Sequence, residues 1–268
     1  MAQLNVVKEV CDEADTVYSE ATAKVYEKNR ESSLFYRLER AFFDELIGSV
    51  HEKSILDVGC GAGTRIFSLL DAGAALAHGV ELSQNMLDIA RQNAADRTNV
   101  SFSQGDAAEI QNLGTRFDLV VSEFVFCYAP NRGVLIKMLQ NCFNHLAPGG
   151  KFVATTSDPW QGNDYKEHNE RQKLNHGVSY SGYDGHLIEA QTTTVEFTVS
   201  GQEVATATNY WYSSDLYLEL MREIGFVDCR IVCATYCPKS MEPFQEQIQD
   251  LLDEPDYFFI VGSAPVQM

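Results

Sequence analysis

The spacing of apolar residues changes twice along the chain. Between Val10 and Val50, apolar side chains recur at four-residue steps, which predicts two helices with a break near 29–33. From Lys53 to residue 156, short apolar runs alternate with amphipathic stretches. This alternation is typical of βαβ units, in which a parallel sheet carries helices on both of its faces.

The alternating part supplies most of the expected core. Strands are predicted at 54–58, 77–81, 100–104, 117–122 and 151–156. Helices are predicted at 64–72, 83–95 and 134–145. Ser83 is a good N-cap for the second of these helices. We therefore expect an α/β fold with a Rossmann-like, doubly wound and mostly parallel sheet.

After residue 157 the alternation lapses. Residues 158–184 are polar and aromatic and are interrupted by glycine and proline. Two β-rich segments follow at 192–199 and 202–212, and the pair Ser200-Gly201 between them predicts a hairpin. Beyond the hairpin we expect a helix at 215–224 that ends at Gly225, and strands at 231–234 and 257–262.

These boundaries divide a single expected domain into four parts. An N-terminal helical cap covers 1–50 and the βαβ core covers 51–156. A β-rich insert covers 157–212, and a C-terminal helix with the last strands covers 213–268.

Length and composition narrow the function classes. The chain has 268 residues and is 45% apolar, which is enough for a sizeable core. Its 20 basic and 38 acidic residues give a net charge of −18. This charge argues against a nucleic-acid partner and against an anionic membrane surface. Acidity by itself says nothing about the fold.

The location of the protein is predicted from two further features. No apolar run approaches the roughly 18 residues of a membrane span, and residues 1–11 contain no apolar signal core. The seven cysteines are an odd number, which is typical of reduced thiols. We therefore expect a cytoplasmic protein.

The strongest local signal is a glycine-rich turn directly after the first strand of the core. Gly59, Gly61 and Gly63 alternate there and lead into a helix. Glycine allows positive φ angles and close approach of a ligand to the backbone. A dinucleotide fingerprint requires a third glycine at Thr64 or Ile66, and a P-loop requires Gly-Lys-Ser/Thr. Neither pattern is met.

Two acidic residues follow the next two strands. Glu81 ends the second strand, 22 residues after Gly59, and Asp106 follows the third strand. Each acid by itself is typical of a helix cap or a solvated side chain. Open α/β sheets, however, bind ligands at the carboxyl ends of their strands, where a carboxylate can accept hydrogen bonds from ribose hydroxyls.

Together these motifs resemble those of class I S-adenosylmethionine-dependent methyltransferases, specifically the small-molecule branch. The matching stretches occur in the family's order: 57–63, 81–87, 105–107, 117–122 and 146–150. They cover the core over about 50–156, whereas the cap and the insert match only loosely.

The resemblance implies a site for S-adenosyl-L-methionine along the carboxyl edge of the sheet. Gly59, Gly61 and Gly63 would bend the backbone around the methionine portion, and Asp57 would hold its ammonium group. Glu81 would accept hydrogen bonds from the ribose hydroxyls.

The same resemblance assigns the adenine site. Leu82 and Met86 would pack against the faces of the ring, Asp106 would accept from its amino group, and the Ala107 N–H would donate to a ring nitrogen. An ordinary core position is the alternative for Met86.

The sulfonium end and the cap complete the implied site. Ser122 and Glu123 would lie beside the sulfonium. Tyr26 and Arg30 are four residues apart and would share a helix face, where the Arg30 guanidinium suits the methionine carboxylate. A solvated surface position is the alternative for both.

The sequence does not identify the general base. Many relatives carry a histidine near Cys127, and its absence leaves the general base undefined. Weak candidates are Glu123, Tyr128 and His176, with packing as the alternative for Tyr128 and simple solvation for His176. The spacing of histidines and cysteines predicts no metal site.

These inferences predict an enzyme that transfers a methyl group to O or N of a small, flat or aromatic molecule, in secondary metabolism. The aromatic side chains of the insert favour such an acceptor. Two alternatives are a nucleotide-dependent oxidoreductase and a non-catalytic regulatory protein that binds the cofactor. The acceptor's identity, the choice between O and N, and the oligomeric state stay open.

Overall fold

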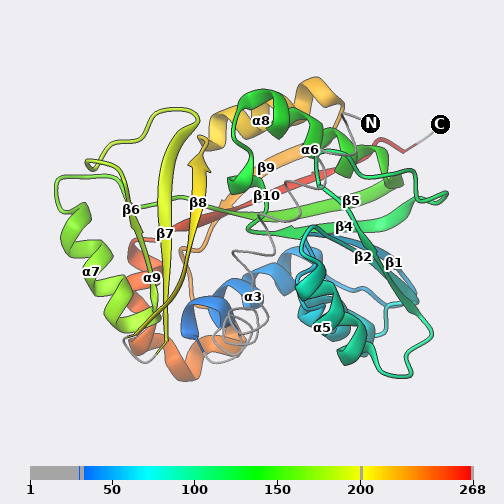
Figure 1. The fold of residues 1–268 in the computed structure, drawn as a ribbon, viewed down its shortest axis with the longest axis horizontal. Helices are drawn as coiled ribbons and strands as arrows, with labels where there is room; N and C mark the ends of the chain where they lie inside the picture. The colour runs from blue at the N-terminus through cyan, green and yellow to red at the C-terminus, as the bar shows by residue number, and fades with distance from the viewer. Residues whose placement is uncertain (1–29, 31–32, 200–201, 267–268) are drawn as a thin grey trace.

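The computed structural model describes residues 30, 33–199 and 202–266 (Figure 1). The first of the two predicted N-terminal helices, together with Tyr26, lies outside these described residues. The helix α3 (Leu34–Ile47) is the part of the predicted cap that the structure describes.

A seven-stranded sheet forms the centre of the molecule, with the order β3-β2-β1-β4-β5-β10-β9. Its parallel part contains β1 (Ser54–Val58), β2 (Leu76–Glu81), β3 (Val100–Gln104), β4 (Phe117–Glu123) and β5 (Leu146–Ser157). The strand β10 (Tyr257–Ser263) runs antiparallel to both β5 and β9 (Val227–Cys233). The prediction of a Rossmann-like, mostly parallel sheet is confirmed.

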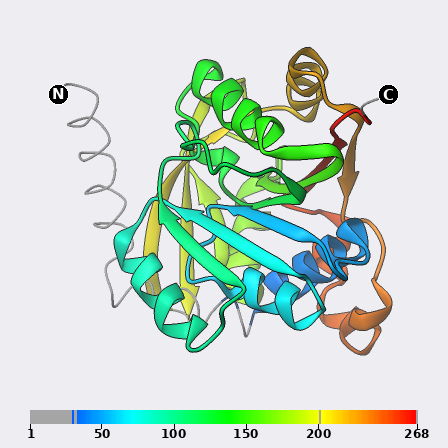
Figure 2. The same cartoon turned by 90° about the vertical axis from the view of Figure 1, so that its right-hand side faces the viewer.

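Helices cover both faces of this sheet (Figures 1 and 2). One face packs with α3, α4 (Thr64–Asp71) and α5 (Gln84–Ala94) in one hydrophobic cluster. The other face packs with α6 (Arg132–Asn144) and α8 (Ser214–Ile224) in a second cluster. Adjacent residues of β1 belong to different clusters, because successive side chains of a strand point to opposite faces.

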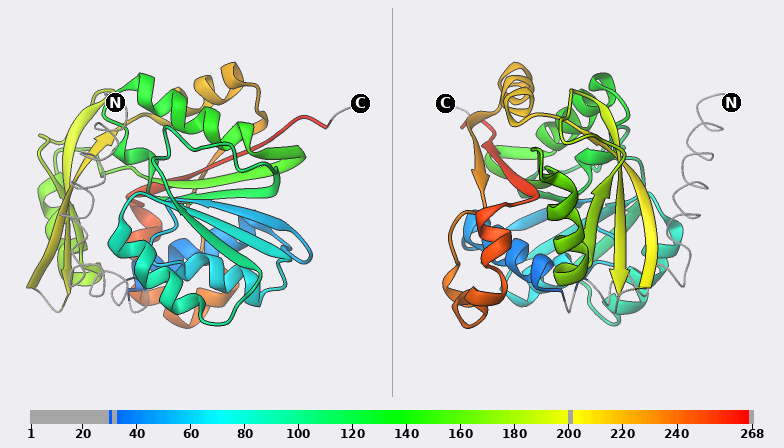
Figure 3. Two further views of the ribbon diagram at one scale, coloured as in Figure 1. Left: turned by 45° about the vertical axis from the view of Figure 1, so that its right-hand side comes forward. Right: turned by 90° about the vertical axis from the view of Figure 1, so that its left-hand side faces the viewer.

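The predicted hairpin is part of a separate, antiparallel three-stranded sheet. It consists of β6 (Val178–Ser181), β7 (Gln191–Val199) and β8 (Gln202–Trp211) in the order β6-β7-β8. The chain enters this region directly after Ser157, the last residue of β5. The small sheet therefore lies near the carboxyl ends of the parallel strands, beside the central sheet (Figure 3).

Two helical regions were not expected from the sequence. The helix α7 (Tyr165–His176) lies in the stretch that we interpreted as irregular, because its polar residues show no apolar stripe. The short helices η2 (Lys239–Gln247) and α9 (Gln249–Asp253) occupy the region between the last two predicted strands. η2 packs against α3.

The described residues contain no helix that is both long enough and apolar enough to span a membrane.

Candidate functional site

The glycine-rich turn has the backbone that its sequence predicts. Gly59, Gly61 and Gly63 have φ angles of 77°, 52° and 82°, which residues other than glycine rarely adopt. A Cβ atom at Gly59 would lie 2.2 Å from a methyl carbon of Val125. The turn is fixed to the neighbouring strand by the Gly59 N–H, which donates to the Val80 carbonyl oxygen at 2.7 Å.

Glu81 connects this turn to the helix α5. Its carboxylate accepts hydrogen bonds from the Gly61 N–H at 3.0 Å and from the Ser83 N–H at 2.9 Å. Ser83 is the N-cap of α5, as predicted, and its hydroxyl accepts from the Met86 N–H at 3.3 Å. Two expected cofactor contacts, Glu81 and Gly61, are therefore in direct contact with each other.

Of the residues expected around the adenine ring, Leu82 and Asp106 lie in loops at the edge of the sheet, and Met86 lies in the core. The Leu82 carbonyl accepts from Gln104 at 3.0 Å, which holds the loop after β2 beside the loop after β3. In that second loop Asp106 accepts from the Ala108 N–H at 2.8 Å. Met86, by contrast, is 3% exposed and packs in the core, which is the alternative position that we considered for it.

Ser122 and Asp57, two of the expected cofactor contacts, are both buried in the structure. Ser122 is fully buried, and its hydroxyl donates to the Val58 carbonyl at 2.9 Å, so the structure gives it a bond between neighbouring strands. Asp57 is 2% exposed. Burial raises the pKa of Asp57 to about 8, and the negative charge of Glu123 adds to this effect. A nearby cation would favour its ionised form.

A buried ion network lies beside the glycine turn. The Glu123 carboxylate accepts from the guanidinium groups of both Arg30 and Arg65. Arg65 is 4% exposed, donates to Asp44 at 2.7 Å and lies 4.7 Å from the centre of the Phe43 ring. Our sequence interpretation missed Arg65. The available signal was a charged residue on the apolar face of the first turn of α4.

This network changes the expected role of Glu123. Burial by itself would raise its pKa, but the charges of Arg65 and Arg30 outweigh burial and lower the pKa to about 2. A carboxylate with such a low pKa, engaged by two guanidinium groups, is a poor general base. Arg30 also stacks on Tyr36, with its guanidinium carbon 5.1 Å from the ring centre.

A second buried carboxyl group interacts electrostatically with this network. Glu39 of α3 is fully buried and accepts from the Thr155 hydroxyl at 2.6 Å. Burial, together with the charge of Glu123, raises the pKa of Glu39 to about 7. No local pattern marks this residue as functional, because its position on the buried face of α3 depends on the packing against β5.

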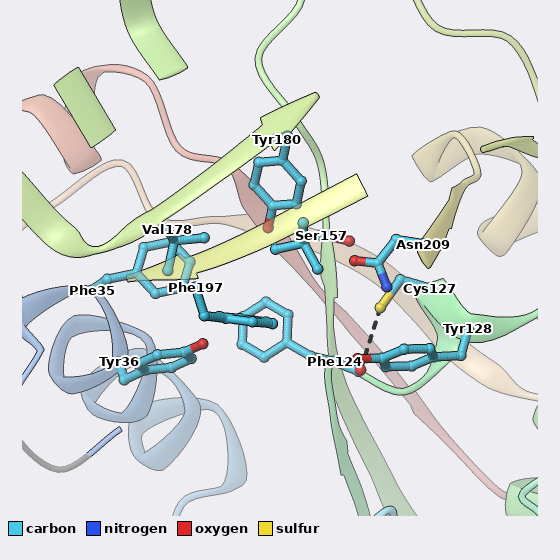
Figure 4. Close-up of a pocket in the computed structure, with 11 residues that line it drawn as sticks. Phe35, Tyr36, Phe124, Cys127, Tyr128, Ser157, Val178, Tyr180, Phe197 and Asn209 are labelled. Carbon is cyan, nitrogen blue, oxygen red and sulfur yellow. Dashed lines mark hydrogen bonds between the residues drawn. The ribbon is translucent and has the colours of Figure 1, made fainter. Parts of the chain in front are cut away.

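An aromatic cavity lies where α3, the end of β4 and the small sheet meet (Figure 4). Its volume is about 20 Å³, room for about one water molecule. It is lined by Phe35, Tyr36, Phe124, Cys127, Tyr128, Ser157, Val178, Tyr180, Val195, Phe197 and Asn209. The candidate Tyr128 is therefore part of the cavity wall. Glu123 directly precedes Phe124, so the cavity adjoins the ion network.

Comparison with known proteins identifies this core. Residues 55–150 match a protein-family model described as a methyltransferase domain. The likeness to a methyltransferase domain thus covers the βαβ core, and the residues before 55 and after 150 lie outside the matched range. The glycine turn, Glu81 and Asp106 all lie within the matched residues, so the family resemblance is confirmed.

Individual relatives agree with this assignment. The chain is 30% identical over 105 residues to a ubiquinone biosynthesis O-methyltransferase of Coxiella burnetii, an alignment that covers 39% of this chain and 43% of that protein. The chain thus matches less than half the length of this curated relative.

Solved structures extend the likeness in fold. The CcbJ methyltransferase of Streptomyces caelestis aligns with a TM-score of 0.62 at 19% identity, over 93% of this chain and 98% of that one. A phosphoethanolamine N-methyltransferase 2 of Haemonchus contortus in complex with S-adenosyl-L-methionine aligns with a TM-score of 0.62 at 17% identity, over 95% and 59%.

The histidines of the insert lie away from the aromatic cavity. His176, a catalytic candidate, ends α7 and forms a hydrogen bond of 3.1 Å with Asp250 of α9. His168 contacts Asp256 and Glu254, each at 2.9 Å. Neither histidine lines the aromatic cavity, and both link α7 to the segment before β10. The structure thus gives His176 a role in holding the insert.

Proposed function

We propose that this protein transfers a methyl group from S-adenosylmethionine to an oxygen or nitrogen atom of a small, uncharged, flat molecule bound in the aromatic cavity. The observation that carries the proposal is the lining of this cavity. Six of the described lining residues are aromatic and none of them is charged. Such a wall suits an aromatic acceptor, because aromatic rings pack well against each other and an uncharged ring loses little hydration when it is buried.

The absence of charge along the described wall also argues against anionic acceptors. A phosphate or carboxylate group needs arginine or lysine partners to offset its loss of hydration. The guanidinium groups of Arg30 and Arg65 are engaged by Glu123. A phosphate ester is therefore a poor candidate acceptor for this cavity.

Cofactor binding is assigned to the carboxyl edge of the sheet. When bound, S-adenosylmethionine supplies the electrophilic methyl group. We propose that Glu81 accepts hydrogen bonds from the ribose, that Asp106 and Leu82 contact the adenine, and that the glycine turn accommodates the methionine portion. Asp57 would ionise beside the ammonium group.

The reaction is an in-line displacement, so the protein's main contributions are orientation and exclusion of water. The acceptor atom would attack the methyl carbon as the bond from that carbon to sulfur breaks, and any proton on the acceptor atom would pass to water. A phenolate or a ring nitrogen with a free lone pair needs no strong base, which suits a cavity whose wall contains no histidine among the described residues. A cavity of about 20 Å³ holds no aromatic ring, so we propose that α3 and the small sheet separate for acceptor entry.

The test uses S-adenosylmethionine with a labelled methyl group, the purified full chain and a panel of acceptors. The panel contains catechol, aniline and imidazole as neutral acceptors and phosphoethanolamine as a charged one. We expect label in a neutral aromatic product and none in phosphoethanolamine. Binding of S-adenosylhomocysteine without transfer to any of these acceptors would support the non-catalytic alternative. Efficient labelling of phosphoethanolamine would contradict the proposed acceptor class.

The comparisons do not favour the oxidoreductase alternative. Location in the cytoplasm and a role in secondary metabolism stay predictions from the sequence.

A further inference from the structure

One wall of the aromatic cavity contains a buried amide. Asn209 lies on β8 of the small sheet and is 3% exposed. The other residues that this sheet contributes to the cavity are Val178, Tyr180, Val195 and Phe197. An amide on this otherwise apolar and aromatic face costs free energy unless it forms hydrogen bonds.

The described residues satisfy little of the hydrogen-bonding capacity of Asn209. A side-chain amide has two N–H donors and an oxygen with two acceptor sites. The structure provides one bond, from Nδ2 to the adjacent Thr208 carbonyl, at a long distance of 3.4 Å. The amide oxygen accepts no hydrogen bond from the described residues. Figure 4 shows the amide directed into the cavity, near Cys127.

Asn209 is also held in a fixed position. Its strand pairs with β7 through Thr193, and the next inward residue, Trp211, donates from its indole N–H to Asp158 at 2.7 Å. The Tyr212 hydroxyl then donates to the Ala129 carbonyl at 2.8 Å, which joins the end of β8 to the loop after β4. A side chain on such a rigid support is preorganised for binding.

Further polar groups lie on the same side of the cavity. Ser157 ends β5, and the Tyr180 hydroxyl points toward it (Figure 4). The opposite wall contains Phe35 and Phe124, whose ring centres are 6.1 Å apart. The cavity thus has an aromatic side and a neutral hydrogen-bonding side.

We infer that Asn209 is a specificity-determining residue, which hydrogen-bonds a neutral polar substituent of the aromatic methyl acceptor. The acceptor class is an uncharged aromatic molecule with a hydroxyl, carbonyl or amide group on the edge that faces β8. This inference rests on the proposed function and adds to it the group by which the acceptor is recognised. A site built to hydrogen-bond a substrate discriminates strongly against an analogue without that group, because the buried amide is then left unpaired.

The experiment compares two probes of equal shape. Catechol and o-xylene differ in that hydroxyl groups replace methyl groups. Their dissociation constants are measured by ligand-observed NMR in the presence of saturating S-adenosylhomocysteine. The proteins are the wild type, Asn209→Leu, and the control Thr208→Val, which changes an exposed residue on the outer face of the same strand.

We expect wild type and Thr208→Val to bind catechol at least 10-fold more tightly than o-xylene. Asn209→Leu should reduce catechol affinity about 10-fold and remove the preference, with unchanged affinity for S-adenosylhomocysteine as evidence that it is folded. An unchanged preference in Asn209→Leu, or no preference in the wild type, would overturn the inference. If S-adenosylhomocysteine itself fails to bind the wild type, the proposed function fails instead.

Discussion

Replacing Arg65 by methionine should destabilise the protein by about 3 kcal/mol. Arg65 is 4% exposed, and its partner Glu123 is also buried. Removal of one partner of a buried pair costs about 3–5 kcal/mol, because the remaining charge has lost its water. We expect the lower end of this range for two reasons. Arg30 still contacts Glu123, and Asp44 is more than half exposed, so water can replace its lost bond.

Urea denaturation at pH 7, followed by circular dichroism, measures this effect. The control is Arg91→Met, which removes a surface pair with Asp88 and should cost less than about 0.5 kcal/mol. A second variant, Arg65→Met with Glu123→Gln, should recover part of the loss, because it removes the buried negative charge as well. A loss below about 1 kcal/mol in Arg65→Met would refute the argument that the network is desolvated.

The pH dependence provides an independent check of the same network. The pKa of Glu123 is lowered from its ordinary value of 4.5 to about 2, so its ionised form stabilises the fold above pH 4.5. This stabilisation is lost as the pH falls from 4.5 toward 2. The difference between wild type and Arg65→Met should therefore shrink over that range.

Three further outcomes are expected. Glu81→Ala should weaken S-adenosylhomocysteine binding by about 1.5–3 kcal/mol in calorimetry, and unchanged affinity in a folded variant would refute the ribose contact. Gly59→Ala should lower the free energy of unfolding by about 1–3 kcal/mol more than Gly114→Ala. Both glycines have positive φ, but of the two only Gly59 has a neighbouring atom within 4 Å of an added Cβ. Equal losses in urea denaturation would contradict this. Burial by itself lowers the pKa of His168, but the bonds and charges of Asp256 and Glu254 outweigh it and raise the pKa above 6.5. The stabilisation by His168 is thus complete below pH 6.5 and is lost as the pH rises through its raised pKa, so the urea midpoint should fall more between pH 6.5 and 9 in wild type than in His168→Gln.

The sequence by itself determined the sheet and the ligand-binding edge. These features depend on local signals: the alternation of strands and helices, glycines at positive φ, and acids that directly follow strands. Glu81 was predicted at this edge because it ends the second strand, and the structure shows its carboxylate accepting a hydrogen bond from the Gly61 N–H. The N-cap at Ser83 is local in the same sense.

Only the tertiary structure decided what lies around that edge. Arg65 and Glu123 are 58 residues apart, and no periodic pattern pairs them. The helix α7 has no apolar stripe to mark it in the sequence, and polar contacts between distant segments hold it, such as that of His176 with Asp250. Strand alternation alone would place Asn209 on one face of β8, but the cavity exists only because α3, β5 and the small sheet meet there. Such contacts depend on the three-dimensional packing of distant segments, which local sequence patterns do not encode.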